Sequence, residues 1–270
     1  MKLLQKVLNF KRSNGSFFYL LKRRAFPNKF PRQLLNKTEK RYWSHSARRI
    51  NEIMDNQDFK YLEIGVAEGS TLQAITSTYK IGVDPNPLFD TTKLPGNVKF
   101  YSLESDIFFQ SLSPSEKFDF IFLDGLHEAN QLLRDFINSL KSLNNQGYIL
   151  IDDIVPSDSI SAIPDIFESY EARGVLPKEG FPWHGDCFKI LPIILQMDFL
   201  EKYLIIFPDN PQLLLRVSNW NKCRESLEKS SDSWFQEMQN NTYHSVFAGA
   251  SLKSMPIFLE EFAMKALKNK

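Results

Sequence analysis

Short apolar runs recur along the middle of the chain, and each one closes on a polar residue or a glycine. The runs cover residues 61–65, 81–84, 98–101, 118–124 and 148–152. Because each run is short and bounded by turn-forming residues, we predict five β-strands at these positions. Between them, residues 70–78 and 130–143 carry a helical pattern. Strands that alternate with helices are typical of βαβ units, so the pattern predicts a mostly parallel sheet.

Two further apolar runs follow a proline-rich stretch, at residues 203–207 and 213–217. Only residues 208–212 separate them. A parallel crossover needs about a dozen residues or more, so this short link predicts an antiparallel hairpin. The expected fold class is therefore α/β, with five parallel strands closed by an antiparallel terminal hairpin. We expect an N-terminal helical arm at 1–57, a sheet domain at 58–217 and a C-terminal helical extension at 218–270.

Composition places the chain among ordinary globular proteins. Hydrophobic residues make up 43% and charged residues 24%, which argues against wholesale disorder. The two cysteines are too few for a disulfide scaffold, and the longest apolar stretch near the N-terminus, residues 17–21, is too short for a membrane span or a signal peptide. These features predict a cytoplasmic protein.

Charge is distributed unevenly along the chain. Residues 1–50 hold 14 Lys or Arg against the single acid Glu39, a net charge of +13, whereas the other 220 residues carry −12. A basic arm attracts polyanions, so it predicts contact with an anionic membrane surface, with nucleic acid or with the phosphates of a substrate. The alternative is a solvated arm that packs on the body of the protein or on a second subunit in a homo-oligomer.

The ends of the predicted strands carry the candidate chemistry, because ligands of open α/β sheets bind beyond the carboxyl ends of the strands. Gly65 and Gly69 follow the first strand, where glycine permits tight turns, and Ser70 begins the next helix. Position 67 is Ala and position 71 is Thr, so the glycine fingerprint of nicotinamide-binding proteins is incomplete. An ordinary strand-to-helix turn is the alternative reading of the two glycines.

The next two strands also end in polar residues. Asp84 follows the second strand and can accept hydrogen bonds from a ribose diol, or it can serve as a turn residue before Pro85. Ser105 and Asp106 follow the third strand, where they can face an adenine edge or cap a helix.

Together, Glu63-x-Gly65-x-x-x-Gly69-Ser70, Asp84, the pair Ser105-Asp106 and the run 118–124 resemble class I S-adenosylmethionine-dependent methyltransferases over roughly residues 58–217. The segments 123–128, 150–153 and 183–189 resemble bacterial sugar- and polysaccharide-associated O-methyltransferases of the macrocin type. The resemblance implies a Rossmann-like seven-stranded sheet with helices on both faces. It also implies that Glu63, Gly65 and Gly69 surround the methionine part of the cofactor, that Asp84 holds the ribose and that Asp106 faces the adenine. One departure is Leu126, where the macrocin-type enzymes have a carboxylate.

Acidic residues at the ends of the fourth and fifth strands predict a divalent-metal site. Asp124, Asp152 and Asp153 offer oxygen ligands that suit Mg²⁺. His127 has an ordinary pKa near 6.5, suited to deprotonating an acceptor hydroxyl, and its alternative role is that of a metal ligand. The remaining alternative is that Asp124 and Asp153 cap helices or turns while His127 bonds the backbone.

Downstream, Trp183 and His184 can line an acceptor pocket, because an aromatic face and a polar ring suit sugar recognition. Asp186 is expected to cap a helix beginning near Cys187, and Cys187 to be a packed thiol.

The function predicted from these residues is methyl transfer from S-adenosylmethionine, with assistance by Mg²⁺, to a hydroxyl of a sugar or glycoconjugate, including phosphate-bearing ones. Two alternatives stay open: a noncatalytic protein bound to membrane or nucleic acid, and a nucleotide-cofactor oxidoreductase or epimerase.

Overall fold

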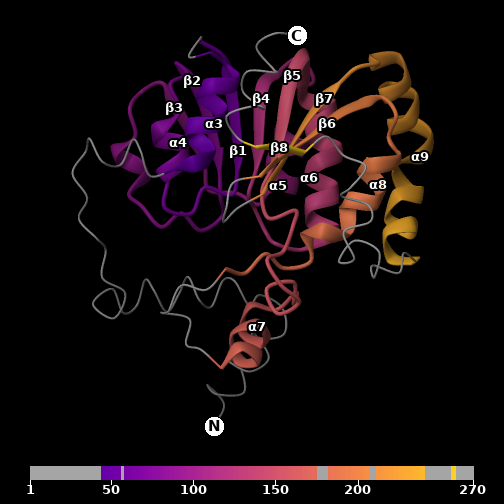
Figure 1. Ribbon diagram of the computed structural model, residues 1–270. Coiled ribbons are helices and arrows are strands. Elements are labelled where there is room, and N and C mark those ends of the chain that lie inside the picture. The colour runs from indigo at the N-terminus through magenta and orange to yellow at the C-terminus, as the bar shows by residue number, and fades with distance from the viewer. Residues whose placement is uncertain (1–43, 56–57, 175–181, 207–210, 241–256, 260–270) are drawn as a thin grey trace.

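The computed structural model describes residues 44–55, 58–174, 182–206, 211–240 and 257–259. These residues form an eight-stranded sheet in the order β3-β2-β1-β4-β5-β7-β6-β8 (Figure 1). Its strands are β1 (Lys60–Ile64), β2 (Tyr79–Val83), β3 (Val98–Tyr101), β4 (Phe118–Leu123), β5 (Leu143–Ile151), β6 (Leu200–Ile206), β7 (Gln212–Val217) and β8 (Ile257–Leu259). Strands β1 to β5 are mutually parallel, and β7 runs antiparallel to both β5 and β6.

The predicted sheet is confirmed: five parallel strands are followed by a hairpin whose last strand inserts beside β5. The C-terminal extension differs from its prediction in one place. Its first part is the expected helix, α9 (Trp220–Asn240), but β8 is a strand that pairs in parallel with β6 where helix was predicted. A three-residue edge strand is too short to show a period, so its apolar run could not be distinguished from part of a helix.

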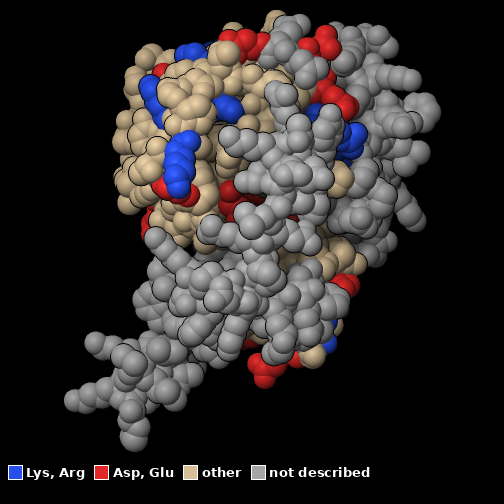
Figure 2. Space-filling view, turned by 90° about the vertical axis from the view of Figure 1, so that its left-hand side faces the viewer, with Lys and Arg blue, Asp and Glu red and all other residues tan. Residues whose placement is uncertain are grey.

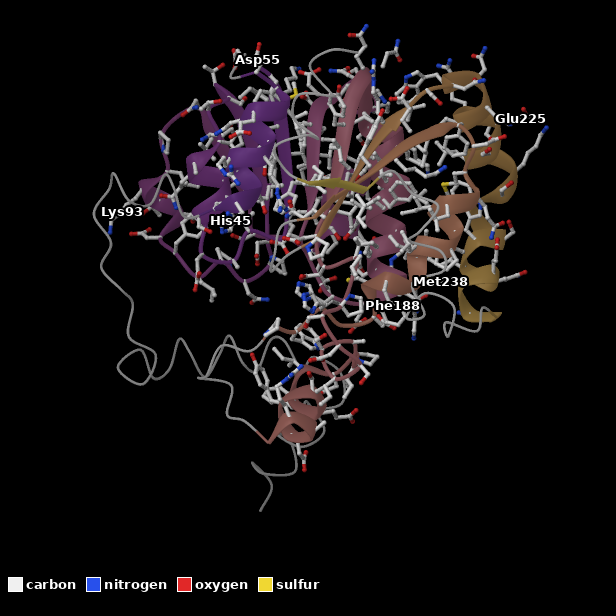
Figure 3. All side chains as sticks on the ribbon, in the orientation of Figure 1. His45, Asp55, Lys93, Phe188, Glu225 and Met238 are labelled. Carbon is white, nitrogen blue, oxygen red and sulfur yellow. The ribbon has the colours of Figure 1, made fainter. Side chains whose placement is uncertain are left out.

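Helices cover both faces of the sheet, as predicted. On one face α3 (His45–Ile53) and α4 (Ser70–Ala74) share an apolar cluster with Tyr61 of β1. On the other face Leu62 of β1 joins the cluster formed with α6 (Ala129–Ser142), α8 (Leu191–Gln196) and α9. Phe188 and Met238 contribute to this second cluster (Figure 3). Successive residues of β1 thus face opposite layers, as the two-residue period of a strand requires.

Four smaller elements lie around the ends of the strands. These are α5 (Ser105–Ser111), the 3₁₀ turns η3 (Thr91–Lys93) and η5 (Cys187–Ile190), and α7 (Ile166–Arg173). The chain reaches α7 after leaving the carboxyl end of β5, and this helix stands away from the sheet (Figure 1). The additions after β5 are therefore positioned to border the carboxyl edge, where ligands of such sheets bind.

Residues 1–43 of the predicted basic arm lie outside the described residues. The described part, α3, packs against the sheet through Ala47 and Ile50, which are 1% and 0% exposed. Arg49 is fully buried, and its Nη1 donates to Oε1 of Gln212 in β7 at 2.6 Å. Arg49 was counted among the basic residues of the arm, but its side chain is buried and hydrogen-bonded to the sheet.

In the part of the chain that is described, no helix has the length and hydrophobicity needed to cross a bilayer. On the described part of the face seen in Figure 2, basic and acidic side chains are interspersed. Contact with an anionic membrane through the arm remains a prediction.

Candidate active site at the carboxyl edge of the sheet

Two glycines shape the loop between β1 and α4. Gly65 and Gly69 have φ angles of +83° and +74°, in the left-handed region that other residues avoid. A Cβ atom on Gly65 would lie 1.9 Å from the carbonyl oxygen of Asp124, and one on Gly69 would lie 2.8 Å from Nε2 of Gln73. Gly65 is therefore needed for the close approach of the β1 and β4 ends, beyond any role toward a ligand.

Asp84, at the end of β2, binds this loop directly. Its Oδ2 accepts hydrogen bonds from the backbone N–H groups of Val66, at 2.9 Å, and Ala67, at 2.7 Å, while Oδ1 accepts from that of Asn86 at 2.7 Å. A carboxylate has about four acceptor positions, so one remains for a ligand. Asp84 is thus both a turn residue and the residue that fixes the glycine loop.

Glu63 and Ser70 flank the loop in different surroundings. Glu63 is 1% exposed and accepts a hydrogen bond from the hydroxyl of Tyr61 at 2.7 Å. Burial raises the pKa of Glu63 well above its usual range, which favours the neutral acid. Ser70 is the exposed first residue of α4. Glu63 also accepts a hydrogen bond from the backbone of Leu72 in α4, and its predicted role toward the cofactor remains a prediction.

Ser105 and Asp106 begin α5 and contact α6. Gln131 Nε2 donates to Oγ of Ser105 at 3.0 Å, and Arg134 Nε lies 3.0 Å from Oδ2 of Asp106 in an ion pair. Glu104 occupies the N-cap position of α5 without a side-chain capping bond. One oxygen of Asp106 is therefore engaged by Arg134, which limits the residue's predicted role toward an adenine.

Sequence analysis missed Asp135, the buried acid beside this pair. Asp135 is 3% exposed and accepts from Gln131 Nε2 at 3.1 Å. Burial raises its pKa to about 6, and hydrogen bonds from Ser105 and Gln131 oppose that rise. Asp135 lies in the middle of an amphipathic helix. The sequence showed only an acidic residue in a predicted helix and gave no signal that this position is buried.

The fourth and fifth strands bring a carboxylate–imidazole cluster together. Nε2 of His127 lies 3.0 Å from Oδ2 of Asp153 and 3.7 Å from Oδ1 of Asp124. One potential ligand atom from each of the three residues falls within 4.8 Å of the others. His127 Nδ1 faces the backbone carbonyl of Trp183 at 3.1 Å, and the two rings stack with centroids 4.8 Å apart. The ring of His127 is thus fixed from two sides.

The predicted metal site consisted of Asp124, Asp152 and Asp153. Among the described residues, Asp152 is not part of the cluster that Asp124, His127 and Asp153 form. Its Oδ1 accepts from the backbone N–H of Asp153 at 2.9 Å, and the side chain of Gln212 lies within hydrogen-bonding reach. Asp153 has a φ of 54°, and this left-handed turn at the end of β5 brings its carboxylate beside His127. His127 thus supplies the third potential ligand atom, which was expected from Asp152.

The cluster is strongly coupled electrostatically. Burial raises the pKa of Asp124 to about 6, although His127 opposes the rise. Burial also acts against charge on Asp153, but the neighbouring His127 lowers the pKa of this carboxyl overall. For His127, burial disfavours the charged ring, yet Asp153 and Asp124 raise its pKa well above the usual value. In the protein alone, therefore, a positive charge between the two carboxylates is favoured.

The segment carrying Trp183 and His184 borders the cluster. Trp183 Nε1 donates to the carbonyl of Ile163 at 2.8 Å. His184 is 3% exposed, its Nε2 lies 3.6 Å from Oδ1 of Asp153, and its buried Nδ1 has no hydrogen-bond partner among the described residues. Asp186 does not cap the turn at Cys187 as predicted. Its Oδ1 instead accepts from the backbone N–H of Ala129 at 2.6 Å and so caps α6.

Cys187 is buried, in agreement with the predicted packed thiol. Burial raises the pKa of its thiol well above the usual range, which disfavours the reactive thiolate.

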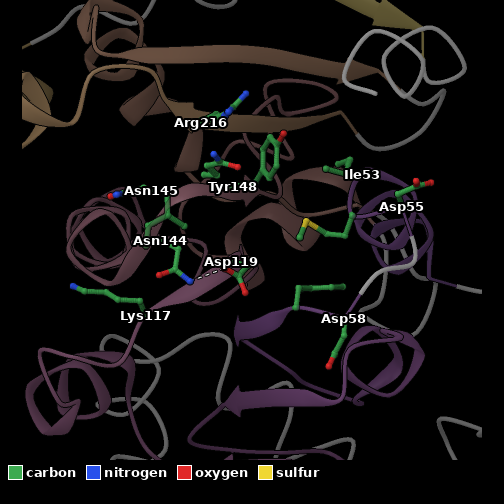
Figure 4. Close-up of a pocket in the computed structure, with 13 residues that line it drawn as sticks. Ile53, Asp55, Asp58, Lys117, Asp119, Asn144, Asn145, Tyr148 and Arg216 are labelled. Carbon is green, nitrogen blue, oxygen red and sulfur yellow. Dashed lines mark hydrogen bonds between the residues drawn. The ribbon is translucent and has the colours of Figure 1, made fainter. Parts of the chain in front are cut away.

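A separate hollow of about 740 Å³ lies at the opposite, amino edge of the sheet (Figure 4). Its lining includes Phe59 before β1, Lys117 before β4 and Asn144 at the start of β5. Asp119 in this hollow is bonded to Asn144 at 2.5 Å and to the backbone of Lys60 at 2.8 Å. None of the predicted site residues lines it, so the candidate site is the carboxyl edge.

Comparisons with known proteins agree with this position. Residues 62–154 match the family model described as "Methyltransferase domain", a segment that runs from β1 through Asp153. A protein of Acanthamoeba polyphaga mimivirus, uncharacterized protein R132, is 28% identical over 127 residues, which cover 40% of this chain and 58% of that protein. The chain thus spans little more than half the length of this curated relative.

Among solved structures, the plantazolicin methyltransferase BpumL, in complex with a monoazolic desmethylPZN analog and SAH, is similar with a TM-score of 0.50 and 15% identity. The match covers 79% of this chain and 97% of that one. The SAH-bound methyltransferase PaMTH1 of Podospora anserina has a TM-score of 0.49 and 14% identity, with 81% and 97% of the two chains covered. Residues 62–154 therefore resemble a methyltransferase domain, and the sheet has the Rossmann-like fold of class I methyltransferases.

Proposed function

We propose that the protein is an S-adenosylmethionine-dependent methyltransferase that modifies a hydroxyl group of a sugar or glycoconjugate. The observation that carries the proposal is a contact between two parts of the site at the carboxyl edge of the sheet. The glycine loop, whose counterpart in this fold holds the methyl donor, packs against Asp124, which belongs to the cluster with His127 and Asp153. A donor on the loop and an acceptor on the cluster would then be neighbours, as transfer requires.

The residues of the loop fit the cofactor. When bound, S-adenosylmethionine supplies an activated methyl group. Asp84 keeps the loop in its left-handed turns and retains an acceptor position for a ribose hydroxyl. Gln131, Ser105 and Asp135 form the polar surface between α5 and α6 on the side where the base is expected.

The cluster fits a divalent cation, because Asp124, His127 and Asp153 present three ligand atoms within 4.8 Å. A cation bound there lowers the pKa of a hydroxyl that it contacts. The carboxylates of Asp124 and Asp153 place negative charge beside His127, where it favours a bound proton or cation. Trp183 fixes the orientation of His127, and its half-buried ring offers an aromatic face for a sugar. His184, which is buried beside Asp153, would contribute to sugar binding from behind this ring only if the segment moved. Binding of a phosphate-bearing acceptor or an anionic membrane by the basic N-terminal residues is part of the same proposal.

Calorimetric titration with SAH tests the assignment of the cofactor loop. Replacing Asp84 by Ala removes the acceptor of two loop N–H groups. Hydrogen bonds to charged groups are worth about 1.5–3 kcal/mol, so affinity should fall roughly ten- to a hundredfold. Asp90→Ala, at the exposed turn η3, is the matched control and should bind like the parent. An Asp84→Ala protein that binds SAH as tightly as the parent would contradict the assignment.

Transfer itself is tested by mass spectrometry of sugars and glycoconjugates incubated with the protein and S-adenosylmethionine. We expect a mass increase of one methyl group on a hydroxyl, which chelator abolishes. Binding of a reduced nicotinamide cofactor without any response to SAH would favour the oxidoreductase or epimerase alternative.

A further inference from the structure

We propose that Asp124, His127 and Asp153 form a mixed nitrogen–oxygen site that selects a first-row transition-metal dication over Mg²⁺, with Nε2 of His127 as a direct ligand. The inference deepens the proposed function by specifying the metal, and it rests on that function only for the role of the metal in methyl transfer. The magnesium expected from three carboxylates is thereby replaced.

The spacing of the three residues is that of ligands around one ion. At metal–ligand distances near 2.1 Å, adjacent octahedral ligands lie about 3.0 Å apart and opposite ones about 4.2 Å apart. The His127–Asp153 and His127–Asp124 separations of 3.0 and 3.7 Å fall in this range. The limit of 4.8 Å for the whole group requires only small movements.

The orientation of His127 sets its lone pair toward the carboxylates. Nδ1 faces the carbonyl of Trp183 at 3.1 Å, and a carbonyl can only accept, so Nδ1 carries the proton. In the neutral ring the lone pair is then on Nε2, between two carboxylates that would repel it. Ligating histidines characteristically donate their other N–H to a backbone carbonyl or carboxylate in this way. A cation at Nε2 resolves the repulsion.

His184 provides an independent indication of a ligand. This second imidazole is 3% exposed and points Nε2 toward Oδ1 of Asp153, the oxygen that His127 does not contact. The 3.6 Å separation is too long for a hydrogen bond, and Nδ1 has no partner among the described residues. A buried ring nitrogen without a partner marks a site whose polar contacts are incomplete without a bound group.

The donor set determines the choice of ion. Mg²⁺ favours oxygen ligands and demands near-ideal octahedral geometry, whereas imidazole suits transition metals and affinity rises from Mn²⁺ toward Cu²⁺. An all-oxygen trio would need Asp152, but its carboxylate is engaged by the backbone of Asp153 and lies beside Gln212. The ion therefore meets one nitrogen and two carboxylates.

Electron paramagnetic resonance of Mn²⁺, titrated into the chelator-stripped protein with Mg²⁺ as competitor, tests the proposal without any activity assay. We expect Mn²⁺ to bind at least tenfold more tightly than Mg²⁺. The echo modulation of bound Mn²⁺ should show coupling to a histidine nitrogen in the unmodified protein. Weaker binding of Mn²⁺ than of Mg²⁺, no binding of Mn²⁺, or absence of the nitrogen coupling overturns the proposal.

Two variants separate ligation by His127 from its structural role. His127→Asn should lower Mn²⁺ affinity by about ten- to a hundredfold, and His127→Asp, which makes the site all-oxygen, should bring the Mn²⁺ and Mg²⁺ affinities close together. Asp198→Asn, a 65%-exposed carboxylate that precedes β6 on the amino edge, should bind metal like the parent. Retained SAH binding checks that each variant is folded. An unchanged preference for Mn²⁺ in folded His127→Asp also overturns the proposal.

Failure of the proposed function gives a different pattern. Selective Mn²⁺ binding through His127 in a protein that binds no SAH supports this metal site and contradicts the methyltransferase proposal. SAH binding with methyl transfer in full chelator, and no Mn²⁺ binding, overturns the metal site and leaves methyl transfer in place.

Discussion

Replacement of Gln212 by Leu should destabilise the protein strongly, because this buried amide is hydrogen-bonded to two residues of α3. Gln212 is fully buried in β7. Its Oε1 accepts from Arg49 Nη1 at 2.6 Å, and its Nε2 donates to Oγ of Ser46 at 2.7 Å. Burial raises the pKa of Asp152 well above its usual range, and a hydrogen bond with the Gln212 side chain opposes that rise. A leucine of similar size fills the space but satisfies none of these groups.

The magnitude follows from the charge on Arg49, which is 0% exposed. A hydrogen bond to a charged group is worth about 1.5–3 kcal/mol, and a buried polar group left without its partner costs about 1–3 kcal/mol. Arg49 keeps other interactions, so the loss is set by its hydrogen bond to Gln212 together with that of Ser46. We expect a loss of about 3 kcal/mol in the free energy of unfolding. For a chain of this size that corresponds to a fall in Tm of roughly 6–12 °C.

Urea denaturation followed by circular dichroism measures this loss. The matched control is Gln196→Leu, because Gln196 is exposed and donates to Glu237 at 2.5 Å on the surface. The control should stay within about 0.5 kcal/mol of the parent. Combining Gln212→Leu with Arg49→Met should cost less than the sum of the two single changes, since the second change removes the buried charge that has lost its hydrogen bond to Gln212. A Gln212→Leu protein within about 1 kcal/mol of the parent would refute the reasoning.

Two further predictions concern α6. The pKa of Asp135 is about 6 in the folded protein against an ordinary 3.8, so the folded state binds the extra proton: the associated stability is present below pH 3.8 and is lost as the pH rises to 6. Asp135→Asn should therefore be more stable than the parent at pH 8, by on the order of 3 kcal/mol, and the gain should vanish near pH 4 in urea titrations; an equal gain at both pH values would contradict this. Asp186→Ala removes the acceptor of the Ala129 N–H at the start of α6 and should cost about 1 kcal/mol in thermal denaturation, whereas Asp186→Asn should cost less; equal losses in the two variants would argue against capping.

The sheet could be predicted from sequence because its information is local. Each predicted strand from β1 to β5 overlaps an observed one, and β3 is observed at 98–101 as predicted. A period of two over a few residues, bounded by turn formers, is sufficient to identify such segments. The antiparallel hairpin of β6 and β7 was predicted from the length of the loop between them alone.

The composition of the cluster could not be predicted, because it depends on one backbone angle. Asp152 and Asp153 are adjacent acids, and the sequence does not distinguish which of them faces Asp124. The φ of 54° at Asp153 decides the matter, and a non-glycine residue in that region is uncommon. Once the chain turns there, Asp153 meets His127 and Asp152 stays with the sheet.

Two other predictions failed because the partner of each residue lies far away in the sequence. Arg49 counted as one charge of a basic arm, but its partner Gln212 lies 163 residues away in sequence. Asp186 stands just before a helical turn, where capping of that turn was the natural expectation. It caps α6 instead, 57 residues earlier in the chain. Charge counts and helix-start rules describe neighbours in sequence, and both residues have their partners elsewhere.

Close contacts also join the glycine loop to the cluster of Asp124, His127 and Asp153. Gly65 forms part of the loop, yet the atoms that exclude a side chain at this position are the backbone of Asp124 and Gly125. Asp84 fixes the loop from β2 through Val66 and Ala67, so any shift of the β2 end is passed to the loop and from there to the end of β4. Packed backbone of this kind transmits strain, because interiors are dense and poorly compressible. The position of the glycine loop and that of the carboxylate of Asp124 are therefore set by one contact between two strand ends. In the proposed function, a methyl group held on the first would be aligned with a hydroxyl held on the second.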